Sequence, residues 1–318
     1  QKGTIKRGGG RCILTGATLN FSHVREQGQK GNLDKRLMAI VAEGERGRAY
    51  FSPETYHEQV ASQAEPTWKP TGSVPEKLTG GTCYKYGLTE WGDLFTDRQL
   101  VALTTFSDLV QEARAEVQQA AVAAETEDPQ GYADAVATFL SIAVDKHADY
   151  NSSICSWHSG KDTIRNTFAR QAIPMTWDFT EVNSFSDSTG NFGSGLDWST
   201  RVLKKLNPKA EGTAHQVDAA SSVNGVKNPV ISTDPPYYDN ISYADLSDFF
   251  HVWLRRSLSD IYPNLFGTML TPKADEMIAA PYRHDGGKEE AKTFFEEGLR
   301  ASFSQMQQHA NADYPVTI

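Results

Sequence analysis

An aspartate and two consecutive prolines follow directly after a short apolar run in the segment VISTDPPYYDN, residues 230–240. Proline cannot donate to a sheet ladder, so Pro235 and Pro236 end a strand rather than continue it. The segment therefore predicts a strand over NPVIST, residues 228–233, that stops at a rigid loop carrying Asp234.

The patterns around this loop indicate an α/β domain. GTAHQVDAA (212–220) predicts a short strand before it, DLSDFFHVWLRRSL (245–258) and KEEAKTFFEEGLRASFSQMQQHA (288–310) predict helices after it, and YPVTI (314–318) reads as the start of a further strand. Such an alternation is typical of a layered α/β fold. Ligands in these folds bind at the carboxyl ends of strands, where Asp234 falls.

The helix predicted over 245–258 is amphipathic. The side chains expected to face inward are Phe249, Phe250, Trp253 and Leu254.

The residues before this domain fall into two regions. Residues 1–95 are rich in Gly, Thr, Lys and Tyr and predict short strands and loops, with a hairpin from KRLMAIVAEG and GRAYFSP turning at EGERG. Residues 96–170 predict two helices, the first capped at Thr96 and Asp97 and the second over 131–152. Residues 171–318 form the third predicted region. The first helix has apolar residues at helical spacing: Leu100, Leu103, Phe106, Leu109, Val110 and Ala113.

Composition excludes several classes of protein. The formal net charge of −9 argues against a strong general affinity for nucleic acid, so any such contact must come from local basic surface. No apolar run is long enough to cross a bilayer, and no signal peptide opens the chain. Cys12, Cys83 and Cys155 are far apart and odd in number, which favours free thiols in a reducing compartment, and we expect a cytoplasmic protein.

The loop DPPY has a specific chemical capacity. The peptide between Pro235 and Pro236 has no N–H, and both φ angles are fixed near −65°, so the Pro235 carbonyl points in one stiff direction beside the Asp234 carboxylate. Two acceptors on a rigid frame suit an amino group with two hydrogens to donate. Tyr237 can stack on the ring that bears this amine, which is worth about 1–3 kcal/mol for a base. Holding both hydrogens frees the nitrogen lone pair for attack on an activated methyl group, so positioning supplies much of the rate.

The motif Asp-Pro-Pro-Tyr resembles the catalytic signature of the amino-group DNA methyltransferases. The longer run TDPPYYDNISYADLSDFFHVWLRRSL is similar to one branch, the large DUF1156-type adenine-specific DNA methylases. Further phrases that resemble this branch are PMTWDFTEVNSFSDSTGN, NLFGTMLTPKADEMIA, PYRHDGGKEEAKTFFEEG and, more loosely, RLMAIVAEGERGRAYFSP. The likeness covers most of the chain and is strongest from residue 170 onward.

The resemblance implies a partial Rossmann-like methyltransferase domain, with a large mixed α+β insertion on its N-terminal side, that uses S-adenosylmethionine. It implies that the chain is an internal fragment, because the glycine-rich donor loop of the family lies upstream. The target base must be flipped out or single-stranded to reach the loop. The implied catalytic residues are Asp234, Pro235, Pro236 and Tyr237, the implied donor contacts are Asp218 and Ala219, and the expected substrate contacts are Tyr238, Asp239, Asn240, Tyr243, Trp177 and Asn183.

Three other patterns have competing interpretations. NFGSGLDW lacks the strand context of a donor loop, so Phe192, Gly193 and Gly195 are predicted as flexible loop, with a helix after them over DWSTRVLKKL (197–206). TWDFTEVNSF is equally consistent with packing and with substrate contact. The branch is described as carrying a zinc ribbon, but Cys12, Cys155 and His158 are too few ligands, so we expect no metal.

A set of basic residues is a candidate phosphate-facing surface, although surface charges are more often only solvated. Its members are Lys204, Lys205, Arg255, Arg256, Arg283 and Lys288.

The predicted function is transfer of a methyl group to the exocyclic amine of adenine, or of cytosine, in DNA. One alternative is methyl transfer to RNA or to a protein amide, although amide-modifying enzymes usually begin this loop with Asn rather than Asp. The other alternative is a non-catalytic binding or assembly module.

Overall fold

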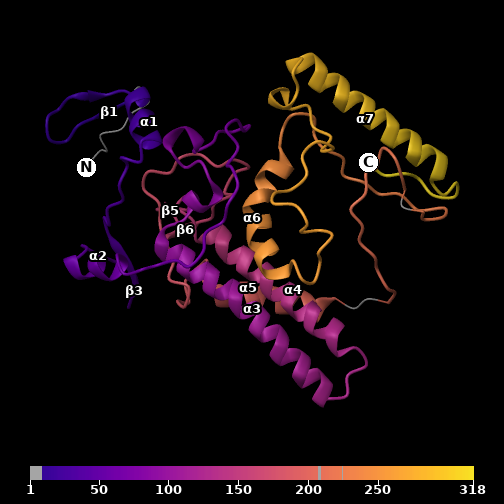
Figure 1. Ribbon diagram of the computed structural model, residues 1–318, viewed down its shortest axis with the longest axis horizontal. Coiled ribbons are helices and arrows are strands. Elements are labelled where there is room, and N and C mark those ends of the chain that lie inside the picture. The colour runs from indigo at the N-terminus through magenta and orange to yellow at the C-terminus, as the bar shows by residue number, and fades with distance from the viewer. Residues whose placement is uncertain (1–8, 207–208, 224) are drawn as a thin grey trace. The chain divides into compact units, whose positions relative to one another are not determined.

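The computed structural model describes residues 9–206, 209–223 and 225–318. The chain forms two compact units: unit 1 comprises Gln1–Leu203 and Phe249–Leu270, and unit 2 comprises Lys204–Asp248 and Thr271–Ile318. The boundaries predicted at residues 95 and 170 therefore lie inside unit 1. Figure 1 shows the elements along the chain.

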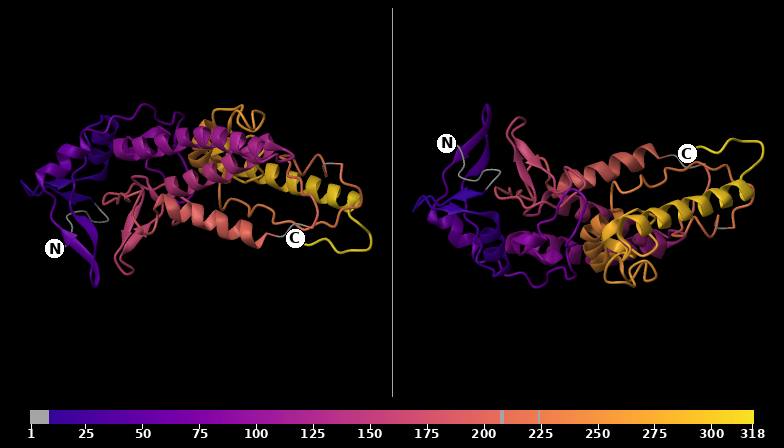
Figure 2. Two further views of the ribbon diagram at one scale, coloured as in Figure 1. Left: turned by 90° about the horizontal axis from the view of Figure 1, so that it is seen from below. Right: turned by 90° about the horizontal axis from the view of Figure 1, so that it is seen from above.

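Unit 1 is built on two long helices, α3 (Asp97–Ala123) and α4 (Pro129–Tyr150). A short connection joins them, and they lie side by side with opposite directions in all views (Figures 1 and 2). The predicted cap of α3 is confirmed: the Thr96 side chain accepts from the Gln99 amide, and the Gln99 side chain accepts from the Thr96 amide, which forms a capping box. Leu100, Leu103 and Val110 are buried as their spacing predicts, but Leu109 is 45% exposed.

Small residues on α4 allow α3 to pack closely. Ala133, Ala137 and Ser141 follow one another at four-residue spacing and are buried. Beside this seam, Arg114 of α3 forms an ion pair with Asp134 of α4 at 2.6 Å.

An aromatic cluster forms the rest of the unit 1 core. The Phe249 ring is fully buried and contacts the rings of Trp91, Phe95, Phe168 and Phe250. Phe249 and Trp253 are buried and Phe250 and Leu254 half-buried, so the inward face predicted for residues 249–254 is confirmed. These residues come from α6 (Tyr243–Leu258), whose residues 243–248 belong to unit 2.

The remaining elements of unit 1 are short. The predicted hairpin is confirmed by β3 (Ile40–Gly44), which pairs antiparallel with β4 (Gly47–Phe51). Two further antiparallel pairs join β1 (Gly10–Arg11) to β2 (Thr18–Leu19) and β5 (Ser156–His158) to β6 (Thr163–Arg165). The short helices are α1 (Phe21–Gln29), α2 (Thr55–Ala61) and the 3-10 turns η1 (Tyr84–Tyr86) and η2 (Trp91–Leu94).

The loop predicted around Phe192, Gly193 and Gly195 is wrong, because these residues open α5 (Phe192–Lys205). The Asn191 side chain accepts from the Ser194 amide at 2.8 Å and caps the new helix. The Phe192 ring stacks on Phe106 with centroids 4.0 Å apart, and Gly195 lies against the backbone of Ala143.

Unit 2 has fewer elements: the start of α6, the 3-10 turn η3 (Pro281–Arg283) and α7 (Gly287–His309). Its buried apolar cluster consists of Ala279, Ala291 and Phe295, with Met277 and Leu299 packed against it. The strand predicted over 212–220 is wrong, since these residues form an exposed coil and turn. The strand predicted over 228–233 is reduced to one parallel bridge between Ser232 and Thr317. No helix among the described residues has the length and apolar character that crossing a membrane requires.

Candidate active site

The loop that carries Asp234 is open to solvent. The Asp234 side chain is exposed and Tyr237 is 61% exposed, so the face of the phenol ring is accessible. The Tyr237 hydroxyl donates to Asp234 Oδ1 at 2.7 Å, and this bond to a carboxylate raises the pKa of Tyr237. The Asp234 carboxylate is thereby held next to the ring, and its second oxygen remains available to a donor.

The two prolines make the loop stiff and leave a free acceptor. Pro235 and Pro236 are half-buried, and neither has a backbone N–H. Within the described ranges of the chain, no protein donor bonds the Pro235 carbonyl. This oxygen and the second carboxylate oxygen of Asp234 are therefore two available acceptors on neighbouring residues.

The chain enters the loop through a strand-like contact. The Thr233 amide donates to the Thr317 carbonyl at 3.0 Å, and the Thr317 amide donates to the Ile231 carbonyl at 3.1 Å. These bonds pair the two segments in parallel on either side of Ser232. The backbone just before Asp234 is thus fixed by residues more than 80 positions later in the sequence.

The chain leaves the loop through a tight turn. Tyr238 has a left-handed backbone with φ of 56°, and the Asn240 amide donates to the Tyr237 carbonyl at 3.2 Å. Asp239 and Asn240 are exposed, and Tyr243, the first residue of α6, is 52% exposed. Four of the predicted substrate contacts, Tyr238, Asp239, Asn240 and Tyr243, therefore belong to one exposed segment beside Asp234.

The residues predicted to contact the methyl donor do not form a site here. Asp218 is exposed in a turn, and its Oδ1 accepts from the Ala220 amide at 2.9 Å. The neighbouring Val217 is 51% exposed, and Ala219 is exposed as well. An adenosine needs an apolar slot beside the acid. As they lie, Asp218 and Ala219 do not fit S-adenosylmethionine.

The other two predicted substrate contacts belong to unit 1. The Trp177 ring is 40% exposed and meets Tyr86 edge to face at 5.4 Å. The Asn183 side chain accepts from the Phe185 amide at 3.0 Å and closes a local turn. Glu181 between them forms a bidentate ion pair with Arg98 of α3. In unit 1 this segment is thus tied to α3 and η1.

A buried ionic network in unit 2 was missed from the sequence. The Arg283 guanidinium donates to Asp245 Oδ2 at 2.8 Å and to Glu276 Oε2 at 2.7 Å. The Tyr282 hydroxyl donates to Asp245 Oδ2 at 2.9 Å. Burial is the main reason why the pKa of Tyr282 rises to about 12. The signal in the sequence was an acid in the first turn of a predicted helix and an Arg in the phrase PYR.

A second pair reinforces this network. Lys273 forms an ion pair with Asp248 at 2.7 Å, and the Asp248 side chain is 1% exposed. Asp248 Oδ1 also accepts from the amide and hydroxyl of Thr271. The residues 271–283 therefore bind the first turns of α6 by charge as well as by backbone contacts.

Half of the candidate phosphate-facing surface is engaged elsewhere. Arg256 donates to Asp108 and lies over the Trp68 ring, and Arg255 donates to the Phe266 carbonyl. Arg283 belongs to the buried network. Lys204, Lys205 and Lys288 are exposed. The three arginines of the candidate surface are therefore engaged in contacts within the protein.

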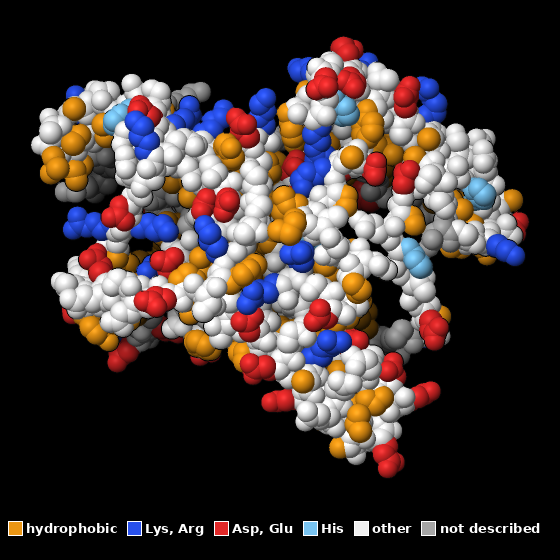
Figure 3. Space-filling model, viewed as in Figure 1, with side chains coloured by type: hydrophobic (Ala, Val, Ile, Leu, Met, Phe, Trp, Pro, Cys, Tyr) orange, Lys and Arg blue, Asp and Glu red, His pale blue; other side chains and the backbone are white. Residues whose placement is uncertain are grey.

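Surface charge is uneven in unit 1. The connection between α3 and α4, at the lower edge of Figure 3, is surrounded by acidic side chains. The exposed acids in the connection and the last turns of α3 are Glu116, Glu125, Glu127 and Asp128. This end of the helix pair disfavours contact with a phosphate backbone.

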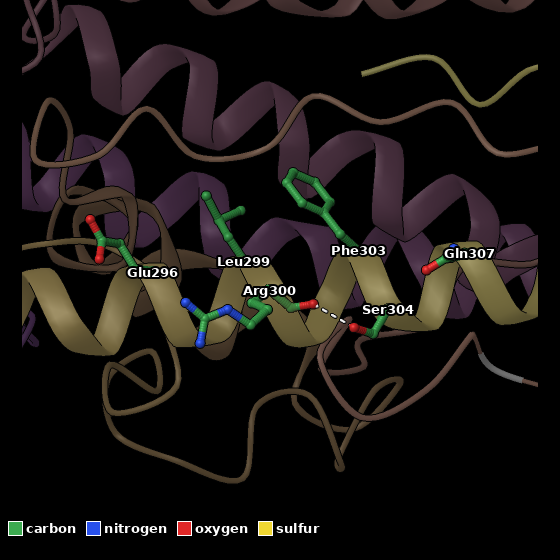
Figure 4. A pocket seen from close by; sticks show the side chains of 6 residues that line it. All are labelled: Glu296, Leu299, Arg300, Phe303, Ser304 and Gln307. Carbon is green, nitrogen blue, oxygen red and sulfur yellow. Dashed lines mark hydrogen bonds between the residues drawn. The ribbon is translucent and has the colours of Figure 1, made fainter.

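A shallow groove of about 450 Å³ runs along one face of α7 (Figure 4). Every residue that lines it comes from this helix at spacings of three or four: Glu296, Leu299, Arg300, Phe303, Ser304 and Gln307. None of them is a predicted site residue, so the groove is separate from the candidate active site.

In the described part of the chain, no cluster of three or more His, Cys, Asp or Glu side chains has the proximity that metal binding needs. The three cysteines are free thiols. Comparisons with protein-family models, with curated proteins and with solved structures found no match to this chain.

Proposed function

We propose that this chain carries the amine-binding loop of an S-adenosylmethionine-dependent methyltransferase that modifies the exocyclic amino group of adenine, or of cytosine, in DNA. The observation that carries the proposal is the open loop itself. Asp234, the Pro235 carbonyl and the exposed Tyr237 ring come from one four-residue stretch of proline-stiffened backbone, and no donor among the described residues bonds that carbonyl.

The side chains of the loop have distinct roles in this proposal. The Asp234 carboxylate and the Pro235 carbonyl accept the two hydrogens of the amine, and the Tyr237 ring stacks on the base. The bond from the Tyr237 hydroxyl orients the carboxylate. Because the groups are fixed before the base arrives, little reorganisation is needed during the reaction.

The parallel contact between residues 231–233 and Thr317 supports an α/β domain. Parallel neighbours require a long crossover between them, and here the crossover contains α6 and α7. This is the arrangement that a Rossmann-like sheet uses next to its catalytic loop. Residues 212–220 form an exposed coil and turn, so they add no further strand next to this parallel contact.

Because Asp218 and Ala219 lie in an exposed turn, they can contact the methyl donor only after this turn rearranges. The same observation favours a second candidate function, a binding or assembly module without catalysis. Calorimetry separates the two: S-adenosylmethionine binding by the product of the complete gene supports the enzyme, and absence of binding supports the module.

Methyl transfer tests the proposal. The product of the complete gene is incubated with labelled S-adenosylmethionine and with duplex or single-stranded DNA. We expect Asp234→Ala to lower labelling by about 100- to 1,000-fold, the cost typical of removing one preorganised hydrogen-bonding group.

Asp313→Ala is the matched control, because it removes an exposed carboxylate of unit 2 outside the loop. It should retain the wild-type rate, and both variants should keep the wild-type circular dichroism. Full labelling by Asp234→Ala would eliminate the proposed role.

A further inference from the structure

The exit of the DPPY loop is anchored by a segment that follows it by some 40 residues. The Tyr238 carbonyl accepts from the Ala279 amide at 3.0 Å, and the Tyr238 ring meets Phe295 edge to face at 5.2 Å. Tyr238 is also the loop residue with a left-handed backbone. This conformation costs a non-glycine residue about 1–2 kcal/mol, so it persists only where neighbouring contacts hold it.

The first turn of α6, directly after the loop, is held by the same segment. Ser242 donates to the Tyr282 hydroxyl at 2.5 Å, and Tyr282 donates in turn to Asp245. Arg283 joins Asp245 to Glu276, and Glu276 Oε1 accepts from the Ala244 amide at 2.8 Å. The chain of bonds therefore starts at Ser242 and returns to Ala244, and it closes around one helical turn.

The network is poorly accessible to water. The Asp245, Arg283 and Glu276 side chains are 6%, 15% and 16% exposed. One guanidinium serves two carboxylates, and a fork of N–H groups is required to bond both at once. A lysine at this position retains the charge but cannot reproduce the geometry.

We infer that residues 276–283 act as a clamp on the DPPY loop, with Arg283 and Tyr282 as its positioning residues. The clamp holds the chain at Tyr238 and again at residues 242–245, so the short link between them has little freedom. The inference rests on the proposed function for its catalytic consequence. Neither residue touches the substrate; each acts by fixing where Asp234 and Tyr237 stand.

The catalytic consequence is a specific split in the kinetics. Base stacking on the exposed Tyr237 ring persists when the loop loosens, so KM should change little. The alignment of the amine between Asp234 and Pro235 matters for the reaction, and a displacement of about 1 Å can cost about 100-fold in rate. Loss of the clamp should therefore lower kcat.

The test uses the product of the complete gene with Arg283→Lys, Tyr282→Phe and the control Arg300→Lys, which makes the same exchange on the exposed face of α7. We expect kcat to fall about 10- to 100-fold in Arg283→Lys. We expect a fall of roughly 2- to 10-fold in Tyr282→Phe, as for loss of a hydrogen bond. KM should stay within about threefold of wild type, and Arg300→Lys should match wild type.

Hydrogen exchange is the second readout and does not depend on activity. Peptides over 237–246 should exchange about tenfold faster in Arg283→Lys, whereas peptides over 292–306 of α7 keep their wild-type rate. Unchanged exchange at 237–246 in both variants would overturn the clamp, and so would faster exchange with unchanged kcat. If the wild-type protein transfers no methyl group, the proposed function fails, and hydrogen exchange alone decides on the clamp.

Discussion

Two buried acids of unit 2 are paired with cations, whereas Asp145 of unit 1 has no ion pair among the described residues; its neighbour Asp149 accepts from the Asn166 side chain and the Phe168 amide. In unit 2, Asp245 is bonded by Arg283 and Asp248 by Lys273. In unit 1, Asp145 of α4 is buried, its Oδ1 has no hydrogen-bond partner among the described residues, and burial followed by the nearby Asp149 charge raises its pKa well above the usual 3.8. In unit 1, packing of helices and aromatic rings offsets the free-energy cost of burying Asp145. The stability of unit 2 depends more on its ionic network.

Most of the buried aromatic packing of the chain lies in unit 1. Phe249 meets four aromatic rings, whereas Phe295 of unit 2 meets the Tyr238 ring and a small cluster of aliphatic residues. The six tryptophans of the chain, residues 68, 91, 157, 177, 198 and 253, belong to unit 1. Tryptophan fluorescence therefore follows the unfolding of unit 1, and hydrogen exchange in α7 follows unit 2.

The largest expected effect is that of Phe249→Ala. Truncating a fully buried Phe lowers the free energy of unfolding by about 3–5 kcal/mol. We expect this loss for unit 1 in urea unfolding followed by tryptophan fluorescence. Phe295→Ala should cost unit 2 less, and Phe303→Ala on the exposed face of α7 should cost little. An equal loss at Phe249 and Phe295 would show that aromatic packing stabilises unit 1 no more than unit 2.

Lys273→Met tests the ionic part of unit 2. Removing the cation leaves Asp248 buried, and we expect a loss of about 2 kcal/mol, below the usual 3–5 because Lys273 is 29% exposed. Asp248→Asn in the same chain removes the unpaired charge and still accepts from Thr271. Hydrogen exchange at 243–248 should be faster in the single variant and largely recover in the double variant. No recovery would contradict the ionic account.

Asp145→Asn tests whether the buried carboxyl of Asp145, which has no cationic partner among the described residues, is held in its neutral form. Since the folded pKa is raised, the native state keeps a proton that the unfolded state releases above pH 3.8, so stability is lost as pH rises toward the folded pKa. Relative to Asp145→Asn, wild-type unit 1 should lose up to about 1.4 kcal/mol per pH unit in this window.

The measurement is the difference between the two proteins in urea unfolding from pH 4 upward. Burial lowers the pKa of His147, which acts in the opposite direction, but both proteins contain it and the difference removes its contribution. Parallel stability curves would show that Asp145 is not held in its neutral form.

Thr96→Ala has the smallest expected effect. It removes the side-chain cap of α3 and should cost about 1 kcal/mol. Thr96→Ser retains the hydroxyl and should lie close to wild type in the same fluorescence assay. A loss of the same size in Thr96→Ser would mean that the methyl group of Thr96, which is 2% exposed, matters more than its cap.

Local signals in the sequence were sufficient for α3, α4, α6, α7 and the hairpin, but not for α1 and α2, which lie in a region predicted to hold only short strands and loops. Thr96 and Gln99 mark the start of α3 within four residues, and the two strands of the hairpin are separated by a short turn. The same reasoning failed at Asn191, whose capping bond to Ser194 starts α5 inside a stretch read as loop. Glycines in a polar stretch concealed only the first turn of this helix, where Phe192 stacks on Phe106 and Gly195 lies against Ala143.

Contacts over long sequence separations could not be predicted. The strand expected over 228–233 forms one bridge because its partner, Thr317, is more than 80 positions away and contributes only that bridge. Apart from the Arg283–Glu276 pair, the network around Arg283 joins residues 32–40 positions apart, and neither partner has a local signal for the other. The loop residues Asp234 to Tyr243 were predicted together because they are consecutive, whereas Asp218 depended on a strand that does not form.

The position of the transferred methyl group shows whether the loop holds an exocyclic amine. DNA labelled by the product of the complete gene is digested to nucleosides, and the position of the label is identified by mass spectrometry. We expect label on the exocyclic nitrogen of adenine or cytosine, and about 100- to 1,000-fold less of it when Asp234→Ala replaces wild type. Label on a ring carbon, or on protein instead of DNA, would contradict an amine held by Asp234 and the Pro235 carbonyl.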